Sequence, residues 1–223
     1  LPLATSQDHK AIGDGDVGLN TGGMGAYSPA PFVDDELQKK IMDEIMLPTV
    51  HGMVDEGMPY RGFLYAGLMI SDQNEPKVLE FNCRFGDPET QPIMMRLSSD
   101  MVELIQACFE GTIESFPIEW DDRTALGIIM ASSGYPEKYA TGLDIHGLDA
   151  MDLAYPEVKI FHSGTAIRNG KIVTSGGRVL CVTALGRDVK QAKKIAYKAV
   201  KKVAWNGVYY RRDIGDKAVK LVN

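Results

Sequence analysis

The sequence predicts an α+β protein, in which helices and an antiparallel hairpin precede a region rich in short strands. Three observations support this class. Apolar residues recur at helical spacing over residues 34–56 and 98–111, on either side of two strand patterns joined by a polar turn at 71–76. After a joint near residues 117–122 the pattern changes to short strands. Residues 188–203 then form the clearest amphipathic helix of the chain.

The amino-acid composition limits the classes of function that the chain can have. The chain has 223 residues, is 44% hydrophobic and 24% charged, and carries a net charge of -6. This balance argues against nucleic acid or a membrane surface as a partner, because both attract basic proteins. No apolar run approaches the roughly 18 residues of a membrane span, and no secretory signal pattern opens the chain. The three widely spaced cysteines predict reduced thiols in a cytoplasmic protein, not a zinc site or a disulfide framework.

The first helix is predicted over residues 34–56, with Asp34 or Asp35 as its cap and Pro48 as a kink or break. Strands are predicted at residues 61–70 and 77–82, where they form a hairpin. The second helix, over residues 98–111, begins at Ser98, Ser99 or Asp100 and stops at Gly111. Its predicted buried face consists of Val102, Ile105, Cys108 and Phe109.

The second half of the chain predicts a set of short strands and one long helix. Asn169-Gly170 is a strong signal for a tight hairpin turn. In the helix over residues 188–203, small apolar residues face inward and lysines face outward, which is typical of a solvated helix face. The strands are predicted at residues 124–130, 158–161, 165–167, 171–173 and 178–183.

Residues 77–91 combine the end of a strand with a highly charged turn. Side chains two apart in a strand share a face, so Glu80 and Asn82 point the same way, and Arg84 continues on that face if the alternation holds. A carboxylate and an amide oxygen are ligands that Mg²⁺ accepts, and a guanidinium suits a carboxylate or phosphate. The alternative is a solvated strand end. The residue types therefore favour, without requiring, a site for phosphate chemistry.

A second block is rich in glycine. Residues 13–25 contain the D-G-D string at 14–16 and glycines at 22, 23 and 25, which let the backbone approach a ligand and direct N–H groups at an anion. The D-G-D string lacks the twelve-residue spacing and final glutamate of a calcium loop. A mobile surface loop is the alternative interpretation.

Both blocks carry a family resemblance. Residues 80–91, read as E-F-N-C-R-F-G-D-P-E-T-Q, resemble the signature of glycinamide ribonucleotide synthetases (phosphoribosylamine–glycine ligases) of the ATP-grasp family. The strings Q-D-H-K at 7–10 and N-T-G-G-M-G-A-Y-S-P at 20–29 resemble the second block of the same family. The resemblance extends to about residue 215 but matches only the carboxy-terminal half of the family's length. It implies that the amino-terminal half is missing here.

The resemblance also implies an organisation and a set of roles. Residues 1–118 are expected to be the carboxy-terminal lobe of an ATP-grasp domain, with an antiparallel sheet and helices, and residues 119–223 the small strand-rich α+β carboxy-terminal domain of the ligase. Mg²⁺ or Mn²⁺ is expected on Glu80 and Asn82, with ATP as co-substrate, and Arg84 and Asp87 are expected to be catalytic. The expected residues that bind glycine and 5-phosphoribosylamine are Asp8, Lys10, Asn20, Thr21, Gly22, Gly23 and Gly86.

Two other functions stay open at the level of the sequence. One is another ATP-grasp ligase that joins a carboxylate to an amine or to bicarbonate. The other is a binding or structural fragment without catalysis, because no P-loop motif is present to cover nucleotide phosphates. The isolated chain is therefore expected to be inactive, with the missing half as its partner.

Many ATP-grasp enzymes place another acidic metal ligand on the first arm of the hairpin, where residues 67–70 offer none.

Overall fold

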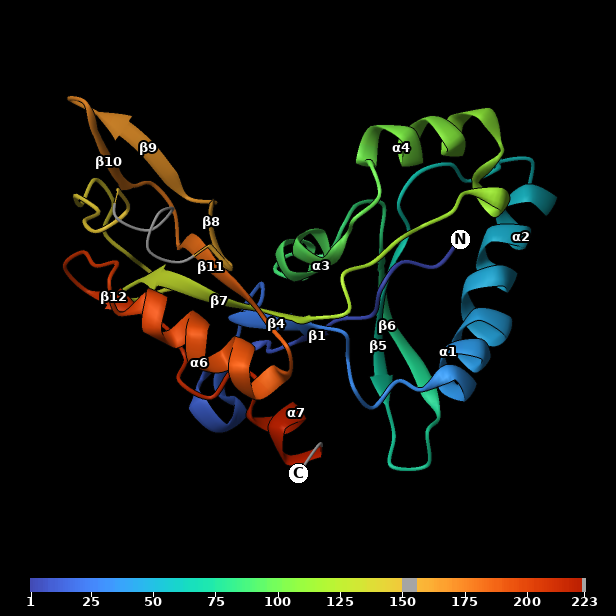
Figure 1. Ribbon diagram of the computed structural model, residues 1–223, viewed down its shortest axis with the longest axis horizontal. Helices are drawn as coiled ribbons and strands as arrows, with labels where there is room; N and C mark the ends of the chain where they lie inside the picture. The colour runs from blue at the N-terminus through green and yellow to red at the C-terminus, as the bar shows by residue number, and fades with distance from the viewer. Residues whose placement is uncertain (150–155, 222–223) are drawn as a thin grey trace. The chain divides into compact units, whose positions relative to one another are not determined.

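The computed structural model of the chain describes residues 1–149 and 156–221, which combine antiparallel sheets with helices and confirm the predicted α+β class (Figure 1). The chain packs as two compact units, each built from separate stretches of sequence. The first unit consists of residues 1–3, 31–86 and 98–120. The second consists of residues 4–30, 87–97 and 121–223, except for positions 150–155 and 222–223, which the structure does not describe.

These packing units differ from the continuous division at residues 118 and 119 that the resemblance implies. Residues 4–30 and 87–97 pack with the carboxy-terminal region, because β4 (Gly25–Ser28) forms a ladder with β7 (Thr124–Ser132). The early glycine-rich block is therefore anchored on a strand that lies about a hundred residues later in the chain.

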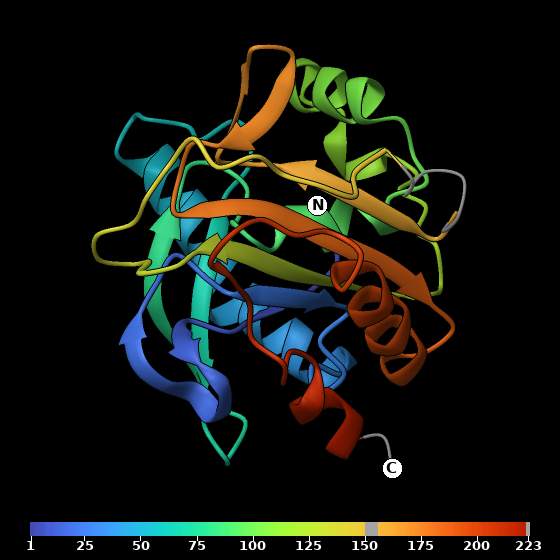
Figure 2. The same cartoon turned by 90° about the vertical axis from the view of Figure 1, so that its left-hand side faces the viewer.

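The second unit is built on one antiparallel sheet, which Figure 2 shows from another side. At its centre β7 pairs with β11 (Arg178–Gly186) along nearly its whole length, and β8 (Val158–His162) lies on the other side of β11. The remaining strands, β1 (Gln7–Asp8), β4 and β12 (Val208–Tyr209), continue the sheet beyond β7. The predicted strands at 124–130, 158–161 and 178–183 are confirmed within a few residues.

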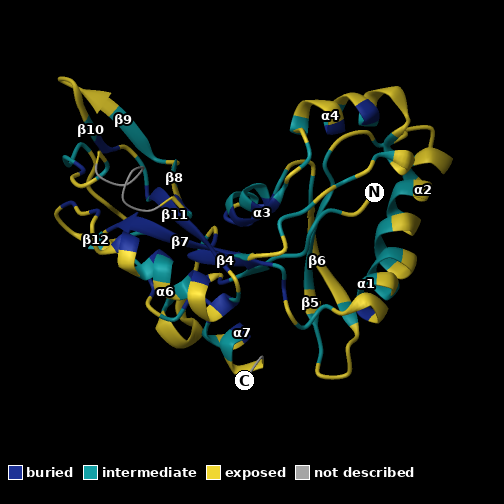
Figure 3. Cartoon of the chain, viewed as in Figure 1, coloured by how far each residue is buried: buried dark blue, intermediate teal, exposed yellow. Residues whose placement is uncertain are grey.

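Helices cover both faces of this sheet. On one face α6 (Val189–Val200) packs its alanines against Leu126, Ile128 and Leu180 in the main apolar core. On the other face α3 (Thr90–Arg96) brings Pro92 close to Gly127. Because both faces are covered, β7 and β11 are buried almost throughout and read as continuous apolar runs (Figure 3). A last helix, α7 (Asp216–Leu221), follows.

Two small hairpins complete the second unit. One joins β9 (Thr165–Arg168) to β10 (Lys171–Thr174), and its turn has positive φ at both Asn169 (50°) and Gly170 (75°), as predicted. The other joins β2 (Ala11–Gly13) to β3 (Val17–Asn20) through the short helix η1 (Asp14–Asp16). There Asp16 pairs with Arg211, so the D-G-D string serves the fold.

The first unit contains the predicted first helix, divided near Pro48. Asp34 caps α1 (Asp35–Ile41), the wider turn η2 (Met42–Met46) follows, and α2 (Leu47–Asp55) completes the helix. Because Pro48 has no N–H, it cannot close the regular hydrogen bond one turn back. The helix continues through this point with a local change of winding.

The first unit also holds the hairpin and the second helix. The hairpin pairs β5 (Tyr65–Ile70) with β6 (Pro76–Asn82), so its first strand begins later than residue 61. Helix α4 (Met101–Glu110) is capped by Asp100 and ends at Gly111 in the left-handed conformation; the short η3 (Ile113–Ser115) follows. The buried residues of α4 are Leu104 and Ala107. The predicted buried face is wrong for Val102 and Phe109, which are exposed, whereas Ile105 and Cys108 are half-buried. No helix within residues 1–149 and 156–221 combines the length and apolarity needed to cross a membrane.

Candidate active site

Glu80 and Asn82 lie on one face of the hairpin, in register with Gly67 and Tyr65 on the neighbouring strand. Glu80 is exposed and Asn82 is half-buried. A Cβ atom at position 67 would lie 3.0 Å from Cγ of Glu80. The glycine on the first arm therefore leaves room for the Glu80 side chain, which explains why that arm offers no carboxylate at this position.

The donor set on this face is one carboxylate and one amide oxygen. Among the residues that the structure describes, no group of three or more His, Cys, Asp or Glu side chains is arranged to hold a metal ion. Mg²⁺ commonly keeps several waters and needs only one or two protein carboxylates when substrate phosphates supply further oxygens. The residues present fit such a cation and do not fit an ion held entirely by protein.

Arg84 does not continue the strand face. The strand ends at Asn82, and Arg84 lies in the following bend. Its Nη1 donates a hydrogen bond to the carbonyl of Phe85 at 2.7 Å, which sets the guanidinium along the local backbone. The expectation that Glu80, Asn82 and Arg84 share one alternating face is therefore wrong for Arg84. The exposed guanidinium still presents further donors to solvent.

In the second unit, Asp8 lies against the glycine-rich block. Its Oδ1 accepts a hydrogen bond from the backbone N–H of His9 at 2.6 Å, and its Oδ2 forms an ion pair with Nζ of Lys10 at 2.8 Å. A Cβ at position 23 would lie 2.3 Å from Cδ of Pro88 and 2.6 Å from Oδ1 of Asp8. Only glycine fits there, and Asp8, Gly23 and Pro88 are thereby brought into contact.

Burial and the nearby Glu89 carboxylate raise the pKa of Asp8 from 3.8 to about 6, against the opposing effect of Lys10. The folded state therefore binds the carboxyl proton of Asp8 more tightly than the unfolded state does. It follows that the contribution of Asp8 to stability falls as the pH rises from about 4 to about 6.

We expect Asp8→Asn to gain stability relative to the unmodified chain by about 2 kcal/mol between pH 4 and pH 7. Urea unfolding at both pH values measures this difference. The exposed Asp72→Asn in the hairpin turn is the matched control and should show no such change. Equal stability differences for Asp8→Asn at the two pH values would contradict the assignment.

The Gly22–Gly23 segment uses its N–H groups inside the protein. The N–H of Gly22 donates to the hydroxyl of Tyr135 at 3.1 Å, and that of Gly23 donates to Oγ1 of Thr21 at 2.9 Å. Thr21 in turn donates from its N–H and its hydroxyl to the carbonyl of Lys10. The expectation that these glycine N–H groups point at an anion is therefore wrong, and the glycines serve close packing instead. Asn20 is exposed at the end of β3.

Arg178, which the sequence reasoning missed, contacts both motif blocks from the start of β11. Its Nη2 pairs with Oδ2 of Asp87 at 2.7 Å, and its Nη1 donates to the carbonyls of Asp87 at 3.0 Å and Gly22 at 2.9 Å. The only sequence signal was a single arginine that precedes an apolar strand and follows two glycines. Gly86, which immediately precedes Asp87 in the chain, is buried.

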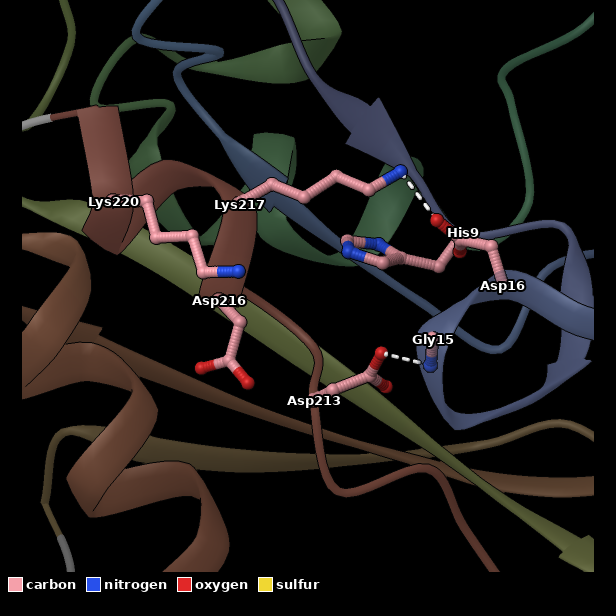
Figure 4. A pocket seen from close by; sticks show the side chains of 7 residues that line it. All are labelled: His9, Gly15, Asp16, Asp213, Asp216, Lys217 and Lys220. Atoms are coloured by element: carbon pink, nitrogen blue, oxygen red, sulfur yellow. Dashed lines mark hydrogen bonds and ion pairs between the residues drawn. The ribbon is translucent and has the colours of Figure 1, made fainter.

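A cavity of about 330 Å³ in the second unit is lined by Gly15 and Asp16 of the glycine-rich block and by residues of the carboxy-terminal segment (Figure 4). Buried His9 faces it, and burial together with Arg211 lowers the pKa of His9 to about 4, so the ring is neutral at pH 7. Around it Lys217 pairs with Asp16, and Asp213 accepts from the N–H of Gly15. These paired charges hold the η1 turn against the carboxy-terminal segment.

Comparison with known proteins first defines the class. A biotin carboxylase from Campylobacter jejuni shares the fold at 13% sequence identity, with a TM-score of 0.55 over 86% of this chain and 41% of that chain. Residues 1–90 match the profile of the ATP-grasp (A) domain of phosphoribosylglycinamide synthetase. The fold is thus that of the carboxy-terminal part of an ATP-grasp protein.

The family follows from the remaining matches. Residues 125–217 match the C domain of phosphoribosylglycinamide synthetase. A phosphoribosylamine–glycine ligase from Pseudomonas syringae pv. tomato is 57% identical over 98% of this chain and 50% of that protein. The crystal structure of a ligase of the same name from Thermotoga maritima is 37% identical, with a TM-score of 0.83 over 95% of this chain and 51% of that one. The chain belongs to the phosphoribosylglycinamide synthetase family and spans about half the length of these relatives.

Proposed function

We propose that the chain is the carboxy-terminal part of an ATP-dependent ligase that joins glycine to 5-phosphoribosylamine in de novo purine biosynthesis. The products are glycinamide ribonucleotide, ADP and phosphate. The observation that carries this proposal is the contact of Asp8, the Gly22–Gly23 segment and the Asp87 turn within one unit of a chain of this family. The names of the relatives support the choice of substrates.

The proposed reaction has two steps. A carboxylate oxygen of glycine attacks the γ-phosphorus of ATP, the bond to ADP breaks, and glycyl phosphate forms. The amine nitrogen of 5-phosphoribosylamine then attacks the acyl carbon, phosphate leaves with the bridging oxygen, and the nitrogen loses a proton. Both steps need charge stabilisation, alignment of the reacting atoms and exclusion of water from the acyl phosphate.

The residues of the hairpin and the following bend are assigned to the phosphoryl step. Glu80 and Asn82 are proposed to hold Mg²⁺ or Mn²⁺, which when bound screens the negative charge of the nucleotide phosphates. Arg84 is proposed to orient the glycine carboxylate or stabilise the transferring phosphoryl group with donors that do not contact Phe85. Asp87 is proposed as the second catalytic residue.

The residues of the glycine-rich block are assigned to substrate binding. Asp8, with its raised pKa and its contact with Gly23, is proposed to orient the amine, and Lys10 to meet an anionic group of the substrate. The loop formed by Asn20, Thr21, Gly22 and Gly23 is proposed to bind glycine and the ribosyl phosphate, and Gly86 is proposed as a further substrate-binding residue. Because the glycine N–H groups are used internally, the loop acts through its shape and side chains.

The location proposed for the parent ligase is the cytoplasm. Cys83, Cys108 and Cys181 are free thiols in the described structure, and unpaired thiols persist in a reducing compartment. The proposed partners are ATP, glycine, 5-phosphoribosylamine and the amino-terminal half of the same protein, without nucleic acid or membrane.

A substrate comparison tests this function. The full-length ligase that contains this chain is incubated with ATP and either glycine plus phosphoribosylamine or bicarbonate, and ADP release is measured. We expect release that depends on glycine and phosphoribosylamine together. Release that depends on bicarbonate would assign the chain to another ATP-grasp ligase. No release with any carboxylate would favour a binding or structural role.

Arg84→Lys in the full-length ligase should lower kcat/KM for glycine by about 100-fold, because an ammonium group is a point charge and cannot hold an oxyanion with two parallel donors. Steady-state kinetics with glycine varied at saturating ATP measures this effect. Arg61→Lys, on the loop before the hairpin, is the matched control. If both KM for glycine and kcat of Arg84→Lys equal those of the unmodified enzyme, Arg84 does not clamp the substrate.

A further inference from the structure

Arg178 contacts the two motif blocks at once. Besides the contacts to Asp87 and Gly22, its Nη1 lies 3.3 Å from the carbonyl of Gly23. The guanidinium therefore contacts three backbone carbonyls and one carboxylate. The acceptors on Asp87 are 91 positions away in the chain, and those on Gly22 and Gly23 are more than 150 positions away. The Arg178 side chain is 18% exposed, whereas the Asp87 side chain with which it pairs is 46% exposed.

The start of β11 directs this side chain toward the blocks. The ladder between β7 and β11 shifts register between Arg178 and Leu180, and such a bulge changes the direction of a side chain. The N–H of Gly164 donates to the carbonyl of Arg178 at 3.0 Å and fixes the backbone at this point. The sheet therefore fixes the backbone from which the guanidinium extends.

Gly22 fits the guanidinium closely. A Cβ at position 22 would lie 2.8 Å from the central carbon of the Arg178 guanidinium. On the other side, Tyr135 accepts the hydrogen bond from Gly22 and packs on Gly177, where a Cβ would lie 2.2 Å from its ring. The Gly22–Gly23 segment is thus held by two residues of the C domain, although it belongs to the ATP-grasp part of the sequence.

We propose that Arg178 is a positioning residue of the ligase reaction, which fixes the Gly22–Gly23 segment against Asp87 so that this segment, Asp8 and Asp87 stay aligned. This inference rests on the proposed function. A planar fork is needed because its two ends reach different acceptors at the same time, and a lysine at this position reaches only part of them. Small displacements of positioning groups reduce rates strongly, by about 100-fold for a shift of roughly 1 Å.

The test compares Arg178→Gln and Arg178→Lys in the full-length ligase with the control Arg168→Gln, an exposed arginine on β9. Three quantities are measured: kcat and KM for each substrate, the ratio of ADP to glycinamide ribonucleotide, and the unfolding midpoint in urea. Arg178→Gln should lower kcat/KM by about 10- to 100-fold. It should also raise the product ratio above one, because water then hydrolyses misplaced acyl phosphate. Arg178→Lys should be intermediate, and Arg168→Gln should match the unmodified enzyme.

A purely structural role predicts a different result. In that case activity per folded molecule, the product ratio and both KM values stay unchanged while the unfolding midpoint falls, and the proposal is overturned. Amide hydrogen exchange of residues 20–24 supplies a readout independent of activity, and Arg178→Gln should accelerate it about tenfold or more. If the unmodified ligase does not use glycine and phosphoribosylamine, the proposed function fails by itself. Unchanged exchange in Arg178→Gln would still overturn the role of Arg178.

Discussion

Glu80→Ala in the full-length ligase is expected to reduce ATP-dependent turnover by about 1,000-fold or more, a loss of roughly 4 kcal/mol in transition-state stabilisation. The side chain supplies the single carboxylate beside Asn82 on the hairpin face, and the neighbouring arm offers Gly67 in its place. Because Glu80 is exposed, its removal should change the free energy of unfolding by no more than about 0.5 kcal/mol.

The measurement is ADP release at saturating Mg²⁺, repeated with Mn²⁺, together with urea unfolding of the same protein. Glu75→Gln is the matched control, because Glu75 lies in the turn of the same hairpin and pairs with Lys40 at 2.6 Å. Glu75→Gln should keep normal turnover. Near-normal activity of Glu80→Ala at saturating Mg²⁺ would refute the assignment of Glu80 to the metal.

The second large effect concerns the chain by itself. The isolated chain is expected to release no measurable ADP from ATP, glycine and phosphoribosylamine, and a separately produced amino-terminal half is expected to restore turnover. Leu37, Leu104 and Ala107 are the buried apolar residues of the first unit among the described positions. Meanwhile Met69, Val78, Leu79 and Phe81 are exposed on its two-stranded hairpin. A hairpin of this kind is marginal without further packing.

The control for this experiment is the chain with Glu80→Ala, added to the same amino-terminal half. Restored turnover with the unmodified chain and none with Glu80→Ala would show that the hairpin of this chain contributes to the reaction. Turnover by the isolated chain at the rate of the full-length ligase would contradict the proposal that it holds only part of the active site.

Local patterns allowed part of the site to be predicted. Glu80 and Asn82 share a face because a strand alternates strictly, and that inference needs only the neighbouring residues. The same rule failed two residues later, since the strand ends at Asn82 and Arg84 lies in a bend. A strand ends where its hydrogen bonds to the neighbouring strand end. The alternation of apolar and polar residues along one strand carries no information about that neighbour.

Contacts between distant residues could not be predicted in this way. Arg178 reaches Asp87 across 91 positions and Gly22 across 156, and no spacing rule connects them. Helix α3 escaped prediction because it has only seven residues and contains Pro92. In α4 the apolar residues lie on more than one side, so periodicity did not identify Leu104 and Ala107 as the buried face.

The ligase that contains this chain is proposed to make and use an acyl phosphate of glycine. The most direct test supplies the full-length ligase with glycine labelled with ¹⁸O in both carboxylate positions and analyses the phosphate that is released. The account predicts one labelled oxygen in each phosphate and the other in the amide product, because the bridging oxygen leaves with phosphorus. Phosphate without ¹⁸O would contradict the account.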